Sequence, residues 1–169
     1  GSYAAFYGGY TRVCTMPNTS PVIDTPELIK HIINLSADLP IYIYPIGAIT
    51  KNQEGLELSE IGQMVSAGAV AISDDGIPVK NSQLMRYALE YAQKFNIPVI
   101  NHAEDCCLVN DGLMHEGLIS LKLGLTGNPD ISESTMIYRD LSIAEYVKGR
   151  LHIPHVSTQK SLEIISDFK

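Results

Sequence analysis

The sequence predicts an α/β fold built around a parallel sheet. Along its 169 residues, five apolar runs rich in β-branched and aromatic residues alternate with segments of helical periodicity. No Asn-Gly or Asp-Gly pair joins two short apolar runs, as it would in a β-hairpin. Because parallel strands must be joined by a crossover, this alternation indicates successive β-α units with right-handed connections.

Five strands are expected from runs of buried-strand residue types, each followed by a polar turn. The first run ends in the loop Met16-Pro17-Asn18-Thr19. The third run leads into Ser73-Asp74-Asp75-Gly76, and the fourth leads into a polar cluster of His102, Glu104 and Asp105. The predicted strands cover residues 10–15, 41–48, 69–72, 97–100 and 151–156.

The helices between these strands have recognisable ends. Gly8-Gly9, Gly68 and Gly149 stand where helical patterns stop, as glycine commonly does at helix C-termini. Thr25 is a capping residue type, and Pro26 stands in the first turn of the second helix. The predicted helices cover residues 3–7, 25–35, 58–66, 82–95, 116–123 and 132–148, and a last helix begins near Thr158.

Two architectures have this order of elements. A five-stranded doubly wound sheet would be complete in itself, whereas a segment of an eight-stranded (β/α) barrel belongs to a domain of ~250 residues. The alternation of helices and strands leaves both open. The chain has neither a Gly-x-Gly-x-x-Gly motif after its first strand nor a P-loop, which are the phosphate-binding motifs that often accompany doubly wound sheets.

Composition and charge argue against several classes of function. A hydrophobic content of 45% with 18% charged residues is typical of soluble globular proteins. The net charge of −7 and the scattered Lys and Arg residues argue against a nucleic-acid partner. Neither a membrane span nor a signal peptide is recognisable. Three cysteines, two of them adjacent, provide no disulfide framework, so a cytoplasmic location is expected.

The ends of the predicted strands indicate a metal site. Asp74-Asp75, His102 and His155 each follow a predicted strand, and the carboxyl ends of parallel strands share one face of a sheet or barrel. Two imidazoles and a carboxylate are suitable zinc ligands, and Glu104 and Asp105 could orient His102. Because these residues are far apart in sequence, the prediction depends on their repeated placement after strands.

Each of these residues also has an ordinary structural explanation. His102 could be a strand-end histidine paired with a neighbouring carboxylate, and Asp74-Asp75-Gly76 could be only a turn. Asn18 could hydrogen-bond within its own loop. The adjacent pair Cys106-Cys107 has no identified neighbouring base and is interpreted as structural. The remaining histidines are expected at ordinary polar positions: His31, His115 and His152.

Several motifs occur in order over essentially the whole chain. They are Gly8-Gly9-Tyr10-Thr11 with Met16-Pro17-Asn18-Thr19, Ser73-Asp74-Asp75-Gly76, His102-Ala103-Glu104-Asp105, Glu116-Gly117 with Leu123-Gly124-Leu125, Arg139-Asp140, and His155-Val156-Ser157. Together they resemble the bacterial class I dihydroorotases of the amidohydrolase superfamily. The resemblance implies a (β/α)8 TIM barrel with a binuclear zinc centre that interconverts dihydroorotate and N-carbamoyl-L-aspartate in pyrimidine biosynthesis.

The resemblance also implies roles for individual residues. His102 and His155 resemble the two histidines that bind the second zinc ion after the fifth and sixth barrel strands. Asp75 resembles the aspartate that bridges the two ions in many bacterial class I enzymes, where related enzymes use a carboxylated lysine, and Asp74 is the alternative. Asn18 resembles the asparagine that hydrogen-bonds the carboxylate of the substrate.

Parts of the family pattern are missing. The His-x-His pair of the first barrel strand and the arginine that follows it do not occur in this chain, and the aspartate that acts as general acid and base would lie beyond Lys169. The five strands therefore correspond to the second through sixth barrel strands, and residues 1–169 are expected to be the central part of a single barrel domain. The intact enzyme is expected to hold two zinc ions, and this chain alone is expected to be inactive.

Three alternatives remain open. A dihydropyrimidinase, hydantoinase or allantoinase is opposed by Asp75, where those enzymes carry the modified lysine. A non-catalytic structural partner of aspartate transcarbamoylase is opposed by His102 and His155, which such proteins typically lose. A free-standing flavodoxin-like binding domain would have to fold alone as a monomer. For the dihydroorotase, the expected partners are a small-molecule substrate and further copies of the chain, with aspartate transcarbamoylase as an additional candidate.

Overall fold

One sheet of five parallel strands organises the molecule. The computed structural model describes residues 1–109 and 111–169. The strands β1 (Arg12–Thr15), β2 (Tyr42–Gly47), β3 (Ala71–Ser73), β4 (Val99–Ile100) and β7 (Leu151–His152) pair side by side in that order. A doubly wound sheet would reverse its strand order at a switch point, so the unbroken order is that of a barrel segment.

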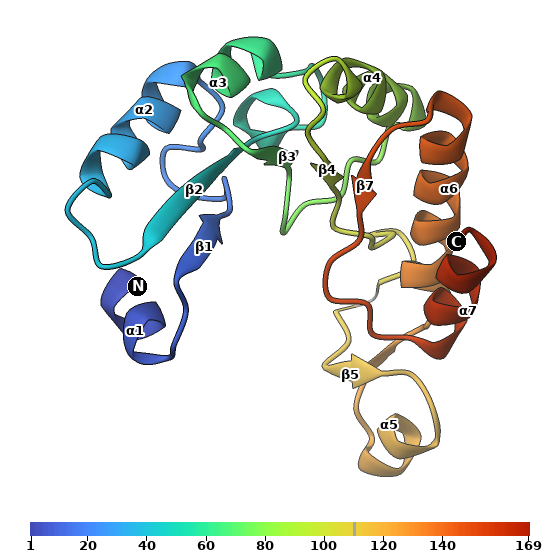
Figure 1. Cartoon of the computed structure of the whole chain (residues 1–169). Coiled ribbons are helices and arrows are strands. Elements are labelled where there is room, and N and C mark those ends of the chain that lie inside the picture. Colours follow the sequence, from blue (N-terminus) through green and yellow to red (C-terminus); the bar gives the residue numbers. More distant parts are fainter. Residues whose placement is uncertain (110) are drawn as a thin grey trace.

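The main helices line only the outer side of the sheet. Figure 1 shows an arch in which the helices follow the outside and the strands follow the inside. These helices are α2 (Pro26–Leu35), α3 (Ile61–Ala67), α4 (Ser82–Gln93) and α6 (Ile131–Val147). Helices on both faces would have indicated the doubly wound alternative. The fold is therefore a partial (β/α)8 barrel. Shorter elements complete it: α1 (Ser2–Tyr7), η1 (Lys51–Gln53) and α7 (Gln159–Asp167).

Most of the hydrophobic core lies between the sheet and the outer helices. Successive strand residues face opposite sides, so that Ile72 and Val99 pack toward the helices, whereas Ala71 and Ile100 belong to a small cluster on the other face. The helices contribute many fully buried side chains to the larger cluster: Ile29, Ile61, Met64, Met85, Ala88 and Leu89. Burial of a large apolar side chain contributes about 1.5–3 kcal/mol, so the outer layer dominates the apolar stabilisation.

Local signals explain several helix ends. Gly68 ends α3 with a left-handed φ of 116°, as predicted. Asn81 caps α4, because its side-chain oxygen accepts hydrogen bonds from the backbone N–H groups of Gln83 (2.9 Å) and Leu84 (3.2 Å). Helix α6 ends at Lys148, which itself has a left-handed φ of 56°, so the chain turns one residue before Gly149.

Most predicted strands and some predicted helices are shorter in the structure, and two of the differences have a clear local cause. The fifth strand covers Leu151–His152 rather than 151–156, because Pro154 has no backbone N–H to pair and His155 has a φ of 38°, outside the β region. Helix α3 begins at Ile61 rather than at residue 58, because Leu58 instead forms an antiparallel bridge with Thr50.

The segment between β4 and α6, which contains the predicted helix at 116–123, forms a small projecting lobe. It contains β5 (Met114–His115), α5 (Leu118–Leu123) and β6 (Gly127–Asn128), and Figure 1 shows α5 far from the main sheet. Strands β5 and β6 pair in parallel and were not predicted, and His115 lies on β5. Asn110 of this segment lies outside the described residues. In the described part of the chain, every helix is too short or too polar to cross a membrane.

Candidate metal centre

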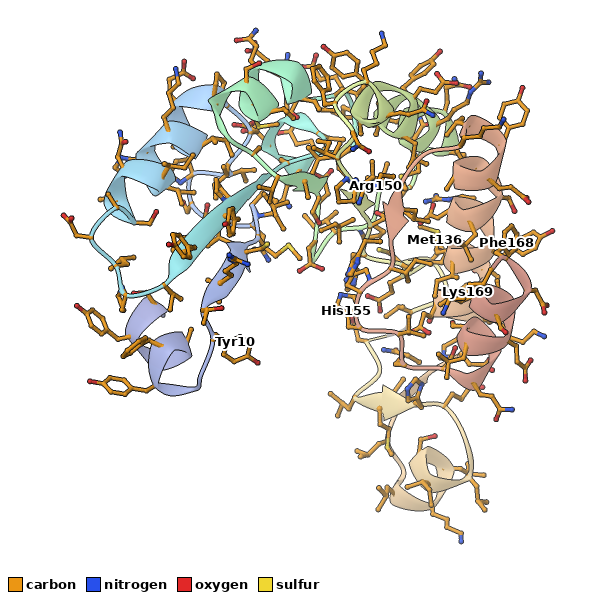
Figure 2. The ribbon with its side chains drawn as sticks, viewed as in Figure 1. Tyr10, Met136, Arg150, His155, Phe168 and Lys169 are labelled. Carbon is orange, nitrogen blue, oxygen red and sulfur yellow. The ribbon has the colours of Figure 1, made fainter. Side chains whose placement is uncertain are left out.

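Three predicted ligands meet at the carboxyl ends of the strands. Asp75 follows β3, His102 follows β4 and His155 follows β7. The Nε2 atom of His155 lies 3.2 Å from Oδ1 of Asp75 and 3.3 Å from Nδ1 of His102, and the third side of the triangle is 3.5 Å. Figure 2 shows His155 on the inner side of the arch. The barrel curvature therefore brings together residues up to 80 positions apart.

The dimensions of this triangle suit a metal ion. Zinc bonds of about 2.0–2.2 Å in tetrahedral geometry place neighbouring ligand atoms about 3.3–3.6 Å apart. The observed distances of 3.2, 3.3 and 3.5 Å match this range closely. Two imidazole nitrogens and one carboxylate oxygen are also the donor types that zinc binds. The three side chains, which we call the triad, can therefore supply three ligand atoms to one zinc ion.

Glu104 fixes the orientation of His102. Its Oε2 atom lies 2.9 Å from Nε2 of His102, on the opposite side of the ring from the triad. Because an ionised carboxylate only accepts hydrogen bonds, this contact favours the tautomer of His102 that has its proton on Nε2 and leaves the Nδ1 lone pair for the triad. The prediction for Asp105 was wrong, because its carboxylate instead accepts the backbone N–H of Cys107 at 2.8 Å.

The two neighbouring aspartates after β3 have different environments. Asp74 is buried and accepts three hydrogen bonds, from the backbone N–H groups of Ile49 (2.8 Å) and Thr50 (3.1 Å) and from the Thr50 hydroxyl (2.5 Å). Burial raises the pKa of Asp74, and the hydrogen bonds from Thr50 and Ile49 offset only part of that rise. Asp75 instead points its carboxylate at both histidines. The geometry thus favours Asp75 over Asp74 as the ligand.

The backbone at His155 is unusual. Its φ of 38° lies in the left-handed region, which L-residues other than glycine rarely adopt. Such conformations persist where surrounding contacts hold them, and they cluster at functional sites. The side chain is 53% exposed, and among the described residues its polar contacts are Asp75 and His102. The strained position therefore delivers the His155 ring into the triad.

Asn18 lies at the same end of the barrel. It is exposed, and a Cβ atom added to Gly76 would lie 3.6 Å from its Nδ2 atom, which places the amide beside the turn that carries Asp75. Gly76 has a φ of 89°, so a glycine suits this turn for conformational reasons as well. Asn18 is therefore close to the triad without belonging to it.

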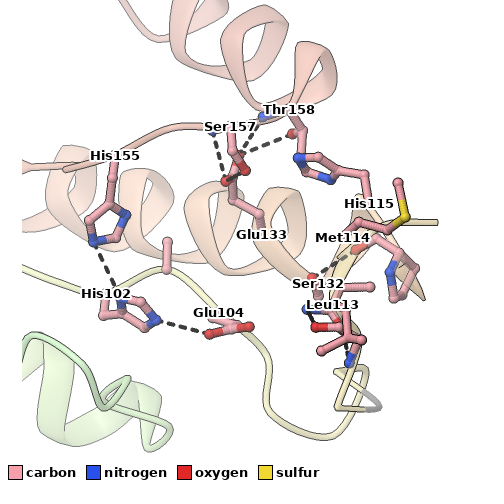
Figure 3. A pocket seen from close by; sticks show the side chains of 14 residues that line it. His102, Glu104, Leu113, Met114, His115, Ser132, Glu133, His155, Ser157 and Thr158 are labelled. Atoms are coloured by element: carbon pink, nitrogen blue, oxygen red, sulfur yellow. Dashed lines mark hydrogen bonds and ion pairs between the residues drawn. The ribbon is translucent and has the colours of Figure 1, made fainter. Parts of the chain in front are cut away.

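An open cavity of about 350 Å³ borders the two histidines. Figure 3 shows His102 and His155 on one side of it and the lobe residues Met114 and His115 on the other. Helix α6 forms the floor with Ser132 and Glu133. The cavity therefore combines the candidate metal ligands with residues of the projecting lobe, including a histidine interpreted from the sequence as an ordinary polar position.

Helix α6 forms hydrogen bonds with the two loops that carry His102 and His155. Sequence reasoning did not predict these contacts. Glu133 accepts hydrogen bonds from Ser157 and Thr158, two and three residues after His155. Asp140 accepts a hydrogen bond from Asn101, directly before His102. Glu133 and Ser157 are 24 residues apart, and Asn101 and Asp140 are 39 apart, so no local spacing could have connected them.

Solved structures that superimpose on nearly the whole chain define its fold class. The chain superimposes on L-hydantoinase (dihydropyrimidinase) from Arthrobacter aurescens with a TM-score of 0.78 and 20% sequence identity, covering 99% of this chain and 39% of that one. A D-hydantoinase (dihydropyrimidinase) from Thermus sp. gives a TM-score of 0.65 at 19% identity, covering 99% and 38%. At these identities the likeness shows the barrel fold alone.

The family follows from sequence. The family model described as dihydro-orotase-like matches residues 1–161, and the chain belongs to this family. Two similar relatives are named dihydroorotase, from Ruminiclostridium cellulolyticum (50% identical) and Acetivibrio thermocellus (51% identical). Each alignment covers 100% of this chain and 40% of the relative. The chain thus spans about 40% of the length of these relatives.

Proposed function

We propose that this chain is the central part of a dihydroorotase, and that the whole protein interconverts dihydroorotate and N-carbamoyl-L-aspartate. Identities of 50% and 51% to relatives named dihydroorotase support the activity. The observation that carries the proposal is the triad, in which Asp75, His102 and His155 meet at distances suited to zinc. A cyclic amide hydrolase of this kind requires such a site.

The sheet edges support the assignment to a central part. Strands β1 and β7 are the outermost strands, and no strand of the described residues pairs with their outer edges. A closed barrel pairs both edges of every strand, and exposed parallel edges leave backbone groups unpaired. We therefore assign β1, β2, β3, β4 and β7 to the second through sixth strands of an eight-stranded barrel.

Different residues of this chain would bind the metal, orient a ligand and bind the substrate. Asp75, His102 and His155 would hold a zinc ion, and Glu104 keeps His102 in the tautomer that exposes Nδ1 to it. Bound zinc lowers the pKa of a coordinated water and polarises a carbonyl oxygen. Asn18, beside the Asp75 turn, would donate its amide N–H to the substrate carboxylate. We assign the general acid and base, together with the ligands that complete a two-zinc centre, to parts of the whole protein beyond these 169 residues.

The proposal extends to biological context. We assign the activity to cytoplasmic pyrimidine biosynthesis by a homo-oligomer with a small-molecule substrate. The three cysteines are free, which supports a reducing compartment, and the net charge of −7 supports the absence of a nucleic-acid partner. Size-exclusion chromatography of the full-length protein, alone and with aspartate transcarbamoylase, tests the oligomer and the additional partner.

Substrate selectivity tests the proposed activity. Full-length protein with zinc should hydrolyse dihydroorotate in preference to dihydrouracil or hydantoin, and removal of the metal by a chelator should abolish turnover. Ring opening is measured as a decrease in ultraviolet absorbance. Turnover of dihydrouracil or hydantoin without dihydroorotate would assign the protein to the related cyclic amidohydrolases. Absence of both metal binding and turnover would leave only a non-catalytic role.

A further inference from the structure

Helix α6 carries two carboxylates on one face. Glu133 and Asp140 are seven residues apart, which corresponds to about two helical turns and places both side chains on the same side. Each carboxylate contacts the loop that carries one histidine of the triad. His102 and His155 lie 53 residues apart in sequence, yet the loops that carry them both form hydrogen bonds with the same helix.

The first fastening holds the segment before His102. The buried Asn101 donates from Nδ2 to Oδ2 of Asp140 at 2.6 Å, and its Oδ1 accepts the backbone N–H of Val79 at 3.1 Å. Arg139 donates to the other oxygen of Asp140 at 2.6 and 2.9 Å. Both oxygens of the buried carboxylate are therefore occupied. Because Asn101 is fixed on two sides, the backbone that leads into His102 has little freedom to shift.

The second fastening holds the segment after His155. Glu133 accepts the backbone N–H (2.9 Å) and hydroxyl (2.5 Å) of Ser157 with Oε2, and the backbone N–H and hydroxyl of Thr158 (both 3.1 Å) with Oε1. Figure 3 shows Glu133 facing this loop from α6. Thr158 also caps α7, since its hydroxyl oxygen accepts the backbone N–H of Ser161 at 3.2 Å. The loop that follows the strained His155 is thus held by one side chain.

We propose that α6 acts as a clamp, in which Glu133 and Asp140 are positioning residues that set the distance between His102 and His155 for metal binding. The inference rests on the proposed function, because it assumes that the triad binds a metal. His155 is half exposed, and among the described residues its ring makes polar contacts with other members of the triad only, so its placement depends on the loop behind it. Displacing either loop opens the 3.3 Å contact between the histidines.

Metal affinity measured beside stability tests the clamp. In the full-length protein, Co²⁺ binding is titrated against a competing chelator, and the Co²⁺ absorption spectrum reports the ligand geometry. Glu133→Gln should weaken Co²⁺ binding about 10- to 100-fold, the range found for residues that orient metal ligands, and should alter the spectrum. Glu145→Gln makes the same change at an exposed position of the same helix and should leave both unchanged.

Two further variants test both contacts of α6. Asn101→Ala removes the buried link to Asp140 and should also weaken Co²⁺ binding. Ser157→Ala guards against simple unfolding, because it removes one exposed hydroxyl from Glu133, and it should fold normally and still weaken Co²⁺ binding several-fold. If Glu133→Gln and Ser157→Ala bind Co²⁺ as tightly as wild type, whatever their melting temperatures, the clamp is wrong while the proposed function stands. If wild-type protein binds neither Co²⁺ nor Zn²⁺, the proposed function fails and the clamp with it.

Discussion

Carboxylates in the triad and carboxylates buried behind it have different partners and different roles. Asp74 and Asp140 are each 1% exposed and accept hydrogen bonds from neighbouring segments. Asp75 is 21% exposed and directs Oδ1 at two histidines. Asp74 accepts backbone N–H groups and Asp140 accepts the side chains of Asn101 and Arg139, so both hold segments of the fold together, whereas Asp75 faces imidazoles and can bind a metal. Burial and the identity of the hydrogen-bond donors therefore separate structural from functional carboxylates.

The largest effect is expected at Asp74. Asp74→Ala leaves two buried backbone N–H groups and one hydroxyl without their acceptor, and should lower the free energy of unfolding by about 3–5 kcal/mol. Denaturant unfolding of the full-length protein measures this loss. The matched control is Asp24→Ala, since Asp24 accepts a single backbone N–H, from Asn52, and its loss should cost about 1 kcal/mol. Equal losses in the two variants would remove the distinction drawn for Asp74.

Substitution of the neighbouring Asp75 should weaken metal binding strongly and change the stability of the fold little. Asp75→Asn removes the ligand charge but keeps the shape, so metal affinity should fall at least about 100-fold, more than the loss of an orienting residue. The free energy of unfolding of the metal-free protein should change by less than about 0.5 kcal/mol, because within residues 1–109 and 111–169 the carboxylate oxygens of Asp75 accept no backbone hydrogen bond. Chelator competition and denaturant unfolding provide the two values. Unchanged affinity in Asp75→Asn would instead direct attention to Asp74.

Glu133 should produce a pH-dependent contribution to stability. Burial alone would raise its pKa, but hydrogen bonds from the Ser157 and Ser161 side chains and from the backbone N–H groups of Ser157 and Thr158 together outweigh it and hold the pKa below the ordinary 4.5. Because the folded-state pKa is lowered, the stabilisation is complete above pH 4.5 and is lost as the pH falls through the lowered pKa. Subtracting the unfolding free energy of Glu133→Gln from that of wild type between pH 7 and pH 3 should show this decline. A difference that grows toward low pH would contradict it.

The smallest effect on the fold is expected at Asn18. Asn18→Ala should change the free energy of unfolding by less than about 0.5 kcal/mol, because the residue is exposed, and should leave metal affinity unchanged. Its effect should appear only with substrate, as about a tenfold rise in KM for dihydroorotate, consistent with one lost hydrogen bond to a charged group. Residual turnover of dihydrouracil, which has no carboxylate, serves as the control. A comparable rise for dihydrouracil would show that Asn18 does not recognise the carboxylate.

Much of the fold could be predicted from local patterns. The β-α alternation and the glycine at the end of α3 were correct because they depend on residues close in sequence. The excess length given to the fifth strand has an equally local cause: apolar residues continue to Val156, but Pro154 and the φ of His155 end the pairing. The β5–β6 pair was missed because its two-residue strands are too short to show a period.

The sequence by itself determined the order of the elements, the family and the residues that follow each strand. It left open the choice between a doubly wound sheet and a barrel, because both have the same β-α alternation, and it left open Asp74 or Asp75 as the ligand. The tertiary structure decided the first through the unbroken strand order. For the second, it directs the carboxylate of Asp75 at the two histidines and that of Asp74 at backbone N–H groups, which supports Asp75 as the proposed ligand. It alone revealed the link from α6 to both histidine loops, because hydrogen bonds across 24 and 39 residues exist only once the chain has curved into the barrel.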